Sequence, residues 1–330
     1  MEARLAPGPV VTSAPRRLAA SIAWVAVAAL GALPAAAGAH PGTGIVEDGA
    51  GRIFFTDLVQ VWRFAPDGRL AVAVPRTHTH ELYLDPSGNL YGEHLEYEAW
   101  AQRWWTRAWK LAPDGVVSEY HPRTEGYPHA VSPAVDGAGN RYFADINHHL
   151  RETARIYRRP PRGEPTLVAG GAWGARDGRV AQARFGSIGG LTAAPDGTLY
   201  VADGDAIRVV SRDGLVSTRA RGGLLRPGSG PATGGLSNHL RGIVADAEAT
   251  VFVANSSARR VLRISPRGDV TVVARSGWPW EPAGVALSRR GLIVLEYRVP
   301  PLPGAQPVRV RRVAADGRVT LLAQTPDDGR

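Results

Sequence analysis

Three histidines stand at equivalent positions of a repeated sequence pattern. Each lies ten residues before the residue at which the first hairpin of its repeat turns; they are His78, His129 and His239. Imidazole nitrogen is a common protein ligand of zinc and other divalent metals. If the three rings converge, we expect them to hold a divalent metal, zinc or calcium. Such a metal would polarise a substrate carbonyl and lower the pKa of bound water.

A second set of polar residues stands six residues after the same turn. Three of them, His94, Asp145 and Asp203, have side chains of the kind that acid–base catalysis uses, so they are the catalytic candidates. Asn255 from this set, and Glu281, which aligns with the three histidines, are candidates for ligand binding. The alternative for the second set is structural, because Asp and Asn side chains commonly cap turns.

Two tryptophans, Trp100 and Trp104, lie in a stretch, Leu95–Trp104, that we expect to be a long loop. Exposed indole rings suit a sugar or an aromatic ligand, which would stack on them. The alternative is that the rings pack this loop onto its neighbour.

The elements that would position these residues are most evident in Gly186–Ala220. Four apolar runs occur there, and Asp-Gly turns separate the first from the second and the third from the fourth. Short β-prone runs joined by Asp-Gly turns predict a four-stranded antiparallel sheet.

The same arrangement recurs in five further segments, which begin at Gly44, His80, Ala134, Arg241 and Ala283. In the fifth of the six repeats, Ala249 replaces the turn glycine. Six sheets of this size predict an all-β, six-bladed β-propeller with four-stranded antiparallel blades. No extra N-terminal strand is evident that could complete the last blade, so we expect packing alone to close the ring.

The turns within the predicted blades are uniformly short on one face of the disc, and the long connections all lie on the other. Binding is expected on the loop-rich face, because variable loops on a rigid scaffold usually carry function.

Several of these segments resemble the NHL repeat. They read D-G-T-L-Y-V-A-D from Asp196, G-N-L-Y from Gly88 and R-G-I-V-A-D from Arg241, with a typical lead-in over Gly174–Leu191. The resemblance covers residues 40–325 and implies a propeller related to lactonases, lyases and binding platforms. Peptide amidating lyases of this architecture hold zinc with inner-strand histidines, which implies the same role for the three histidines above. The Glu and Asn/Asp metal ligands of gluconolactonase-like propellers are not matched.

Residues 1–39 are unlike the rest of the chain. Arg16-Arg17 precede an apolar run from Leu18 to Leu33, and Ala37-Gly38-Ala39 follows. This pattern predicts a secretory signal peptide cleaved after Ala39, with a retained membrane anchor as the alternative. The domains expected are therefore a signal at 1–39 and a single propeller at 40–330, in a secreted or periplasmic protein that is not bound to a membrane after cleavage.

The 330-residue chain carries a net charge of +9 and no cysteine, so its core must be stable without disulfides. Most arginines alternate with apolar residues in predicted strands, as Arg309 and Arg311 do, and we expect them to be solvated. No basic run is interleaved with stacking aromatic residues, which excludes nucleic acid as the expected partner.

The sequence favours an exported, monomeric propeller that binds a small molecule, peptide or glycan in its loop-rich funnel. The alternative is a metal-assisted lactonase, hydrolase or lyase with a histidine-rich funnel site. The sequence does not decide whether the protein is an enzyme.

Overall fold

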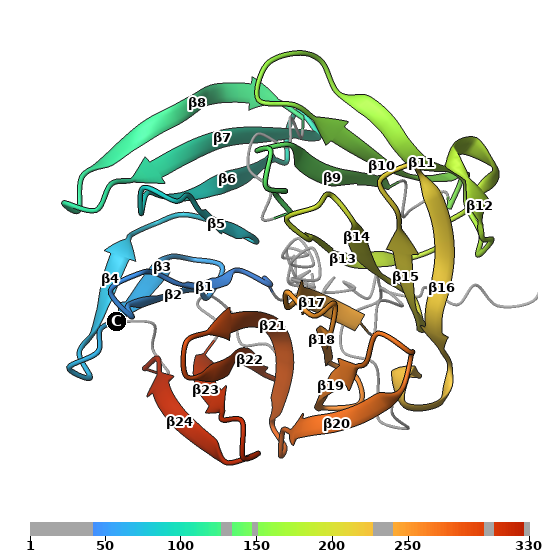
Figure 1. The fold of residues 1–330 in the computed structure, drawn as a ribbon. Coiled ribbons are helices and arrows are strands. Elements are labelled where there is room, and N and C mark those ends of the chain that lie inside the picture. Colours follow the sequence, from blue (N-terminus) through green and yellow to red (C-terminus); the bar gives the residue numbers. More distant parts are fainter. Residues whose placement is uncertain (1–41, 127–133, 147–150, 227–239, 300–306, 327–330) are drawn as a thin grey trace, which may run out of the picture. The chain divides into compact units, whose positions relative to one another are not determined.

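The structure is a computed structural model that describes residues 42–126, 134–146, 151–226, 240–299 and 307–326. Six antiparallel sheets lie one after another around a central axis, in the order of the sequence from blue to red (Figure 1). This is a six-bladed β-propeller, as the repeats predict. Within the described residues, no helix is long and apolar enough to cross a membrane.

Each blade takes its strands from one continuous segment of the chain. Blade one contains β1 (Ile45–Glu47), β2 (Ile53–Thr56), β3 (Val61–Phe64) and β4 (Leu70–Val74). Blade two contains β5 (Leu82–Leu84), β6 (Leu90–Glu98), β7 (Arg103–Leu111) and β8 (Val117–Glu125). Blade three contains β9 (Arg141–Ile146), β10 (Thr153–Arg159) and β11 (Thr166–Ala172).

The second half of the ring is built in the same way. Blade four contains β12 (Gly178–Arg179), β13 (Ile188–Ala193), β14 (Leu199–Asp203), β15 (Ala206–Val210) and β16 (Leu215–Arg221). Blade five contains β17 (Leu240–Ala245), β18 (Val251–Asn255), β19 (Arg260–Ile264) and β20 (Val270–Arg275). Blade six contains β21 (Trp280–Ser288), β22 (Gly291–Arg298), β23 (Val308–Val313) and β24 (Val319–Gln324). Two 3-10 helices, η1 (Val180–Gln182) and η2 (Gly223–Leu225), lie in connections.

Short turns of one type join the strands on the tight-turn face. In the turn after β13, the Gly197 N–H donates to the Ala194 carbonyl oxygen at 2.9 Å, and Gly197 has φ +89°. A left-handed backbone is easily adopted by glycine, which explains the recurrent Asp-Gly signal. Ala249 makes the same turn in blade five, with φ 61°, so its predicted substitution for glycine is confirmed.

Two of these turns are locked by an Asp-x-x-x-Asn-x-Tyr motif. Asp85 accepts hydrogen bonds from the Asn89 backbone N–H at 2.8 Å, the Asn89 side-chain amide at 2.8 Å and the Tyr91 hydroxyl at 3.0 Å. Asp136 repeats all three bonds with Asn140 and Tyr142. The motif therefore has a structural role, because it fixes the first hairpin of blade two and of blade three.

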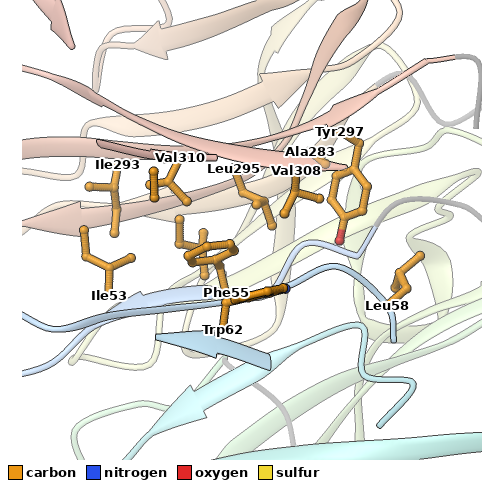
Figure 2. Close-up of a cluster of buried hydrophobic side chains, with 12 residues drawn as sticks. Ile53, Phe55, Leu58, Trp62, Ala283, Ile293, Leu295, Tyr297, Val308 and Val310 are labelled. Carbon is orange, nitrogen blue, oxygen red and sulfur yellow. The ribbon is translucent and has the colours of Figure 1, made fainter. Parts of the chain in front are cut away.

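Apolar side chains from facing sheets are buried between adjacent blades. Blades one and six meet in the closing seam, where Ile53, Phe55 and Trp62 pack against Ile293, Val310 and neighbouring residues (Figure 2). The Tyr297 hydroxyl crosses this seam and donates to the Thr56 carbonyl oxygen at 2.8 Å. Among the described residues, β1 to β4 and β21 to β24 form separate sheets, so no strand is shared between the first and last blades.

Glycine lets the innermost strands of neighbouring blades touch. A Cβ atom on Gly284 of β21 would lie 2.4 Å from the Thr43 carbonyl oxygen, and one on Gly190 of β13 would lie 2.2 Å from the Arg241 carbonyl oxygen. A side chain does not fit at either contact. The inner strands therefore pack backbone against backbone around the axis.

The described blades differ from the sequence prediction in three places, two in the number of strands and one in the length of a hairpin. Blade three has three described strands and a single bridge between Val135 and Arg141, because residues 127–133 lie outside the described part. Blade four gains β12 at its outer edge from the lead-in segment. In blade two, the predicted loop Leu95–Trp104 is wrong: β6 and β7 continue through it and turn only at residues 99–102. The strands continue because no turn residues interrupt them and because β6 and β7 pair along their whole length.

Candidate functional site

Three histidines gather where the chain enters blade two. The chain that leads into β5 runs beside the end of β6, and the ring centroids of His78 and His80 lie 4.7 Å apart. His78 precedes His80 by two residues and so lies on the same side of the extended chain. We call His78, His80 and His94 the histidine cluster.

Hydrogen bonds fix the protonation of the histidine cluster. His78 Nε2 and His80 Nε2 are 2.7 Å apart, a distance at which one proton lies between the two nitrogens. The His78 backbone N–H donates to His94 Nδ1 at 3.0 Å, so Nδ1 is unprotonated and a neutral His94 carries its proton on Nε2.

Burial lowers the pKa of His78, and burial together with the Arg107 guanidinium lowers the pKa of His94. All three rings are only half-buried, so solvent reaches them. The cluster thus combines imidazoles of lowered pKa at His78 and His94 with access from outside, and its nitrogens can accept or donate hydrogen bonds.

The backbone that carries the histidines is held on both sides. The His80 carbonyl oxygen accepts from the Thr43 and Gly44 N–H groups of blade one, at 2.8 and 2.9 Å. The His78 carbonyl oxygen accepts from the Leu95 N–H at 3.0 Å. Between them, the Thr79 hydroxyl accepts from the Trp109 indole N–H at 3.2 Å. The cluster is therefore positioned in advance of any ligand.

A pair of glutamates lies next to the histidine cluster along the chain, since Glu81 follows His80 and Glu93 precedes His94. By the register of β5 and β6, Glu81 stands opposite Glu93. Desolvation of the carboxyl group, with repulsion from Glu93 as a second cause, raises the pKa of Glu81 to about 7. Near neutral pH, Glu81 can therefore hold or release a proton.

In blades five and six, the positions equivalent to His80 and His78 carry the charged residues Arg241 and Glu281. Arg241 is buried at the start of β17 and donates from Nε to the Ser256 hydroxyl at 3.1 Å. Glu281 is 2% exposed, and its Oε1 is 3.2 Å from a nitrogen of Arg259. Burial lowers the pKa of Arg241, while the Glu281 carboxylate opposes that shift. Glu281 is thus engaged with protein groups, and its predicted ligand contact stays a prediction.

The polar residues predicted six positions after the first hairpin turn differ in their burial, since some are buried and others exposed. Asp203 is 5% exposed and accepts from the Gly186 N–H at 2.8 Å and from Arg208 at 2.9 Å. Asn255 is fully buried, and its amide group donates to carbonyl oxygens of residues 224–226. These contacts give both side chains a structural role. Asp145 at the end of β9 is exposed. No observation here tests the catalytic or ligand roles predicted for these residues.

Arginines of the outer strands are less solvated than the alternation predicts. Arg309 and Arg311 both pair with the buried carboxylate of Glu296, Arg309 at 2.5 Å. The expectation that these two arginines are merely solvated is therefore wrong. A carboxylate at the end of β22 draws them inward because a buried charge requires a partner.

Arg208 is a central residue that the sequence reasoning missed. It is fully buried, and its guanidinium binds the carboxylates of Asp203 and Asp177 at 2.9 and 2.7 Å. It also donates to the carbonyl oxygens of Arg176 and Arg184, which fixes the lead-in segment against blade four. The sequence contains one signal for this contact, because Arg208 follows Asp203 by five residues and the same spacing relates Trp62 to Asp57 in blade one. Asp57 likewise binds the indole N–H of Trp62 at 2.7 Å.

The predicted metal site falls largely outside the described part of the chain. His129 and His239 lie in residues that the structure does not describe, and only His78 can be placed. Among the described residues, no three His, Cys, Asp or Glu side chains are close enough to hold a metal ion. The histidine cluster offers two converging nitrogens, whereas zinc sites use three or four protein ligands. The described residues alone therefore do not complete a metal site.

The predicted ligand-binding tryptophans lie at the end of the β6–β7 hairpin. Trp100 is 85% exposed and Trp104 is 39% exposed. Trp104 packs against Tyr97 with ring centroids 4.9 Å apart and ring planes tilted by 44°. Trp109, by contrast, is 6% exposed and belongs to the core, as its position in a strand predicts.

A separate cavity of about 170 Å³ lies between blades one and two, lined by Arg52, Phe54, Gly88 and Pro113 among others. Its lining includes residues of the tight turns after β5 and β7, so it opens at the tight-turn end and not at the histidine cluster.

Comparison with solved structures finds propellers of the same build. A luciferin-regenerating enzyme has a TM-score of 0.52 and 14% identity, over 80% of this chain and 86% of its own. Regucalcin from Agrobacterium tumefaciens, described as a calcium-binding protein, has a TM-score of 0.51 and 16% identity, over 77% and 81%. Virginiamycin B lyase from Staphylococcus aureus has a TM-score of 0.48 and 13% identity, over 85% and 83%.

What they share is the fold. At such identities the likeness extends no further than the six-bladed architecture. No protein-family model matches the chain, and no curated protein matches it.

Proposed function

We propose that the protein binds a small polar ligand, such as a short peptide or a sugar derivative, at the histidine cluster on the loop-rich face. The observation that carries this proposal is the contact between His78 Nε2 and His80 Nε2 at 2.7 Å. A ligand can replace this internal hydrogen bond with its own donor or acceptor. The rigid backbone around the cluster lowers the entropic cost of doing so.

The experiment is a thermal-shift screen of the purified chain against lactones, monosaccharides and dipeptides. A ligand that binds only the folded state stabilises it by RT ln(1 + [L]/Kd), so a compound at about 100 times its Kd adds about 2.7 kcal/mol. We expect this shift to be lost in His80→Gln. It should persist in His121→Gln, which removes a half-buried histidine elsewhere on blade two. A shift that survives His80→Gln would overturn the proposed site.

A metal-assisted lactonase, hydrolase or lyase is the second candidate. It is favoured by the same pair of imidazole nitrogens and by regucalcin, which is described as calcium-binding. His129 and His239 would have to supply the missing ligands. Elemental analysis of protein purified without chelator tests this candidate. Metal well below one equivalent, together with unchanged stability in chelator, would contradict it.

We also propose that the chain is exported and monomeric, with its signal cleaved after Ala39. This proposal rests on the basic flank, apolar run and Ala-Gly-Ala end of residues 1–39. N-terminal sequencing of the exported protein should begin at His40. A protein that retains residues 1–39 in the membrane fraction would favour the anchor instead.

A further inference from the structure

Arg241 is a buried arginine whose guanidinium group is only partly used by the protein. It is 8% exposed, and its Nε donates to the Ser256 hydroxyl at 3.1 Å. Within the part of the chain that the structure describes, its two terminal nitrogens have neither a hydrogen bond nor an ion pair. A guanidinium group keeps its charge even when buried, so donors without an acceptor cost free energy unless another molecule supplies one.

The backbone of Arg241 is held between neighbouring blades at the loop-rich end. β17 and β21, the first strands of blades five and six, lie side by side near the axis (Figure 1). A Cβ atom on Gly190 of β13 would lie 2.2 Å from the Arg241 carbonyl oxygen, and one on Gly242 would lie 2.7 Å from the Ala283 carbonyl oxygen. This close packing on both sides positions Arg241 before any ligand binds, which lowers the entropic cost of binding.

The charges around Arg241 do not cancel. The Glu281 carboxylate attracts Arg241, but its Oε1 already lies 3.2 Å from a guanidinium nitrogen of Arg259. Two guanidinium groups therefore share one carboxylate, and one positive charge is left in excess. Burial lowers the pKa of Arg241 in spite of Glu281, as expected for a charge that the protein does not fully balance. We call Arg241, Ser256 and Arg259 the arginine site.

Donors also outnumber acceptors in the connection between β18 and β19, which follows Ser256. Among the described residues, Ser257 Oγ and Arg259 Nε are buried and have no hydrogen-bond partner. Buried polar atoms are nearly always paired in folded proteins, so unpaired donors indicate a missing acceptor. What this part of the protein lacks is an oxygen acceptor with a negative charge.

We propose that the arginine site binds a carboxylate group, carried by a small organic acid or by the C-terminus of a peptide. The terminal nitrogens of a guanidinium group form a planar fork that matches the two oxygens of a carboxylate. One carboxylate neutralises the single positive charge in excess, whereas a phosphate monoester, with about −1.5 to −2 charges, would exceed it. The arginine site belongs to blades five and six and the histidine cluster to blade two, so either can bind a ligand without the other.

The test is a calorimetric titration of the full chain at constant ionic strength, with matched acid and amide probes. One pair is benzoate and benzamide, and the other is acetyl-dialanine and its C-terminal amide. We expect at least one acid to bind, and its amide to bind at least tenfold more weakly, because the amide has no charge and only one acceptor oxygen. The pair that responds identifies the source of the carboxylate.

Two variants of Arg241 separate binding from folding. Arg241→Met should weaken binding of the acid at least tenfold without lowering the melting temperature, since it removes a buried charge that the protein does not pair. Arg241→Lys keeps the charge but loses the planar fork, so it should also weaken binding. The matched control is Arg267→Met, which removes an exposed arginine from the turn between β19 and β20 at the other end of blade five and should bind like the wild type.

Three results would overturn the proposal: no binding of either acid, equal affinity for acid and amide, or acid binding that survives Arg241→Met. If Arg241→Met melts well below the wild type, the guanidinium has a structural role, and Arg241→Lys then decides. Unchanged acid binding by a folded Arg241→Lys would overturn the proposal, whereas weakened binding would support it.

Discussion

At the scale of single residues, the aspartates at the blade turns make stability depend on pH. Burial alone would raise the pKa of Asp85, but hydrogen bonds from Asn89, with others from Tyr91 and Ser87, bring it below its usual value. Asp136 is shifted in the same direction, with Asn140 and Tyr142 as donors. A carboxyl whose pKa is lower in the folded state binds protons more readily when unfolded. Its contribution is therefore present above the unfolded pKa and is lost as pH falls.

The first prediction follows from these two carboxylates. The free energy of unfolding should fall between about pH 5 and about pH 3, and a variant with both Asp85→Asn and Asp136→Asn should lose less over this range. Urea denaturation at several pH values measures the difference. The same change at Asp85 should lower the pKa of Tyr91, which burial and the Asp85 hydrogen bond raise to about 12. Equal pH slopes in variant and wild type would contradict the prediction.

Ala249 carries the second prediction. Its φ of 61° costs an alanine more than a glycine, by about 1–2 kcal/mol, against about 0.5–1 kcal/mol of extra chain entropy that glycine loses on folding. Ala249→Gly should therefore stabilise the protein by about 0.5–1 kcal/mol. Ala247→Gly, in the same connection, serves as the control and should give no gain. Thermal unfolding measures both, and a lower melting temperature for Ala249→Gly would show that the lost methyl packing outweighs the backbone term.

At the scale of elements, Arg208 joins the lead-in segment to blade four, and the third prediction is its removal. Arg208→Met would leave the Asp203 carboxylate buried without its partner, which costs about 3–5 kcal/mol. The control is Arg69→Met, where the ion pair with Asp67 is exposed, so its loss should change the stability little.

A double variant separates the ion pair from packing. Adding Asp203→Asn to Arg208→Met removes the uncompensated charge and should recover part of the lost stability. Hydrogen exchange over residues 174–185 should also accelerate in Arg208→Met, because its guanidinium holds the Arg176 and Arg184 carbonyl oxygens. No recovery in the double variant would indicate that shape, not charge, makes Arg208 important.

The elements also show how far the sequence predicts this fold. Asp-Gly turns act within a few residues, so β13 to β16 and the other repeats could be located directly. The continuation of β6 through Leu95 depends on pairing with β7 and left no local signal. The candidate site was harder to predict from the sequence than the fold. Aligning the repeats singled out His78 and His94, but the contact between them, and the contact of His80 with His78, are evident only in the structure.

At the scale of the whole molecule, the closing seam between blades one and six holds the ring together, and it carries the fourth prediction. Gly284→Ala would place a methyl group 2.4 Å from the Thr43 carbonyl oxygen, and the required shift should cost about 1–3 kcal/mol. Gly277→Ala is the control, because nothing lies within 4 Å of a Cβ atom there.

Denaturant unfolding distinguishes a local from a global effect of Gly284→Ala. If the seam closes the ring, blades one and six should lose hydrogen-exchange protection before the others do. Uniform loss of protection over all six blades would show instead that the ring unfolds as a single unit.

The same seam dictates an order of assembly during synthesis. The described strands of each blade come from one continuous stretch of chain, so blades one to five can form hairpins as soon as they leave the ribosome. The bond from Tyr297 to Thr56 joins residues 241 positions apart and must wait for the last blade. Until then, the apolar edges of blade one are uncovered. A nascent chain that stalls before residue 280 would therefore present Ile53, Phe55 and Trp62 to chaperones, whereas a finished chain would not.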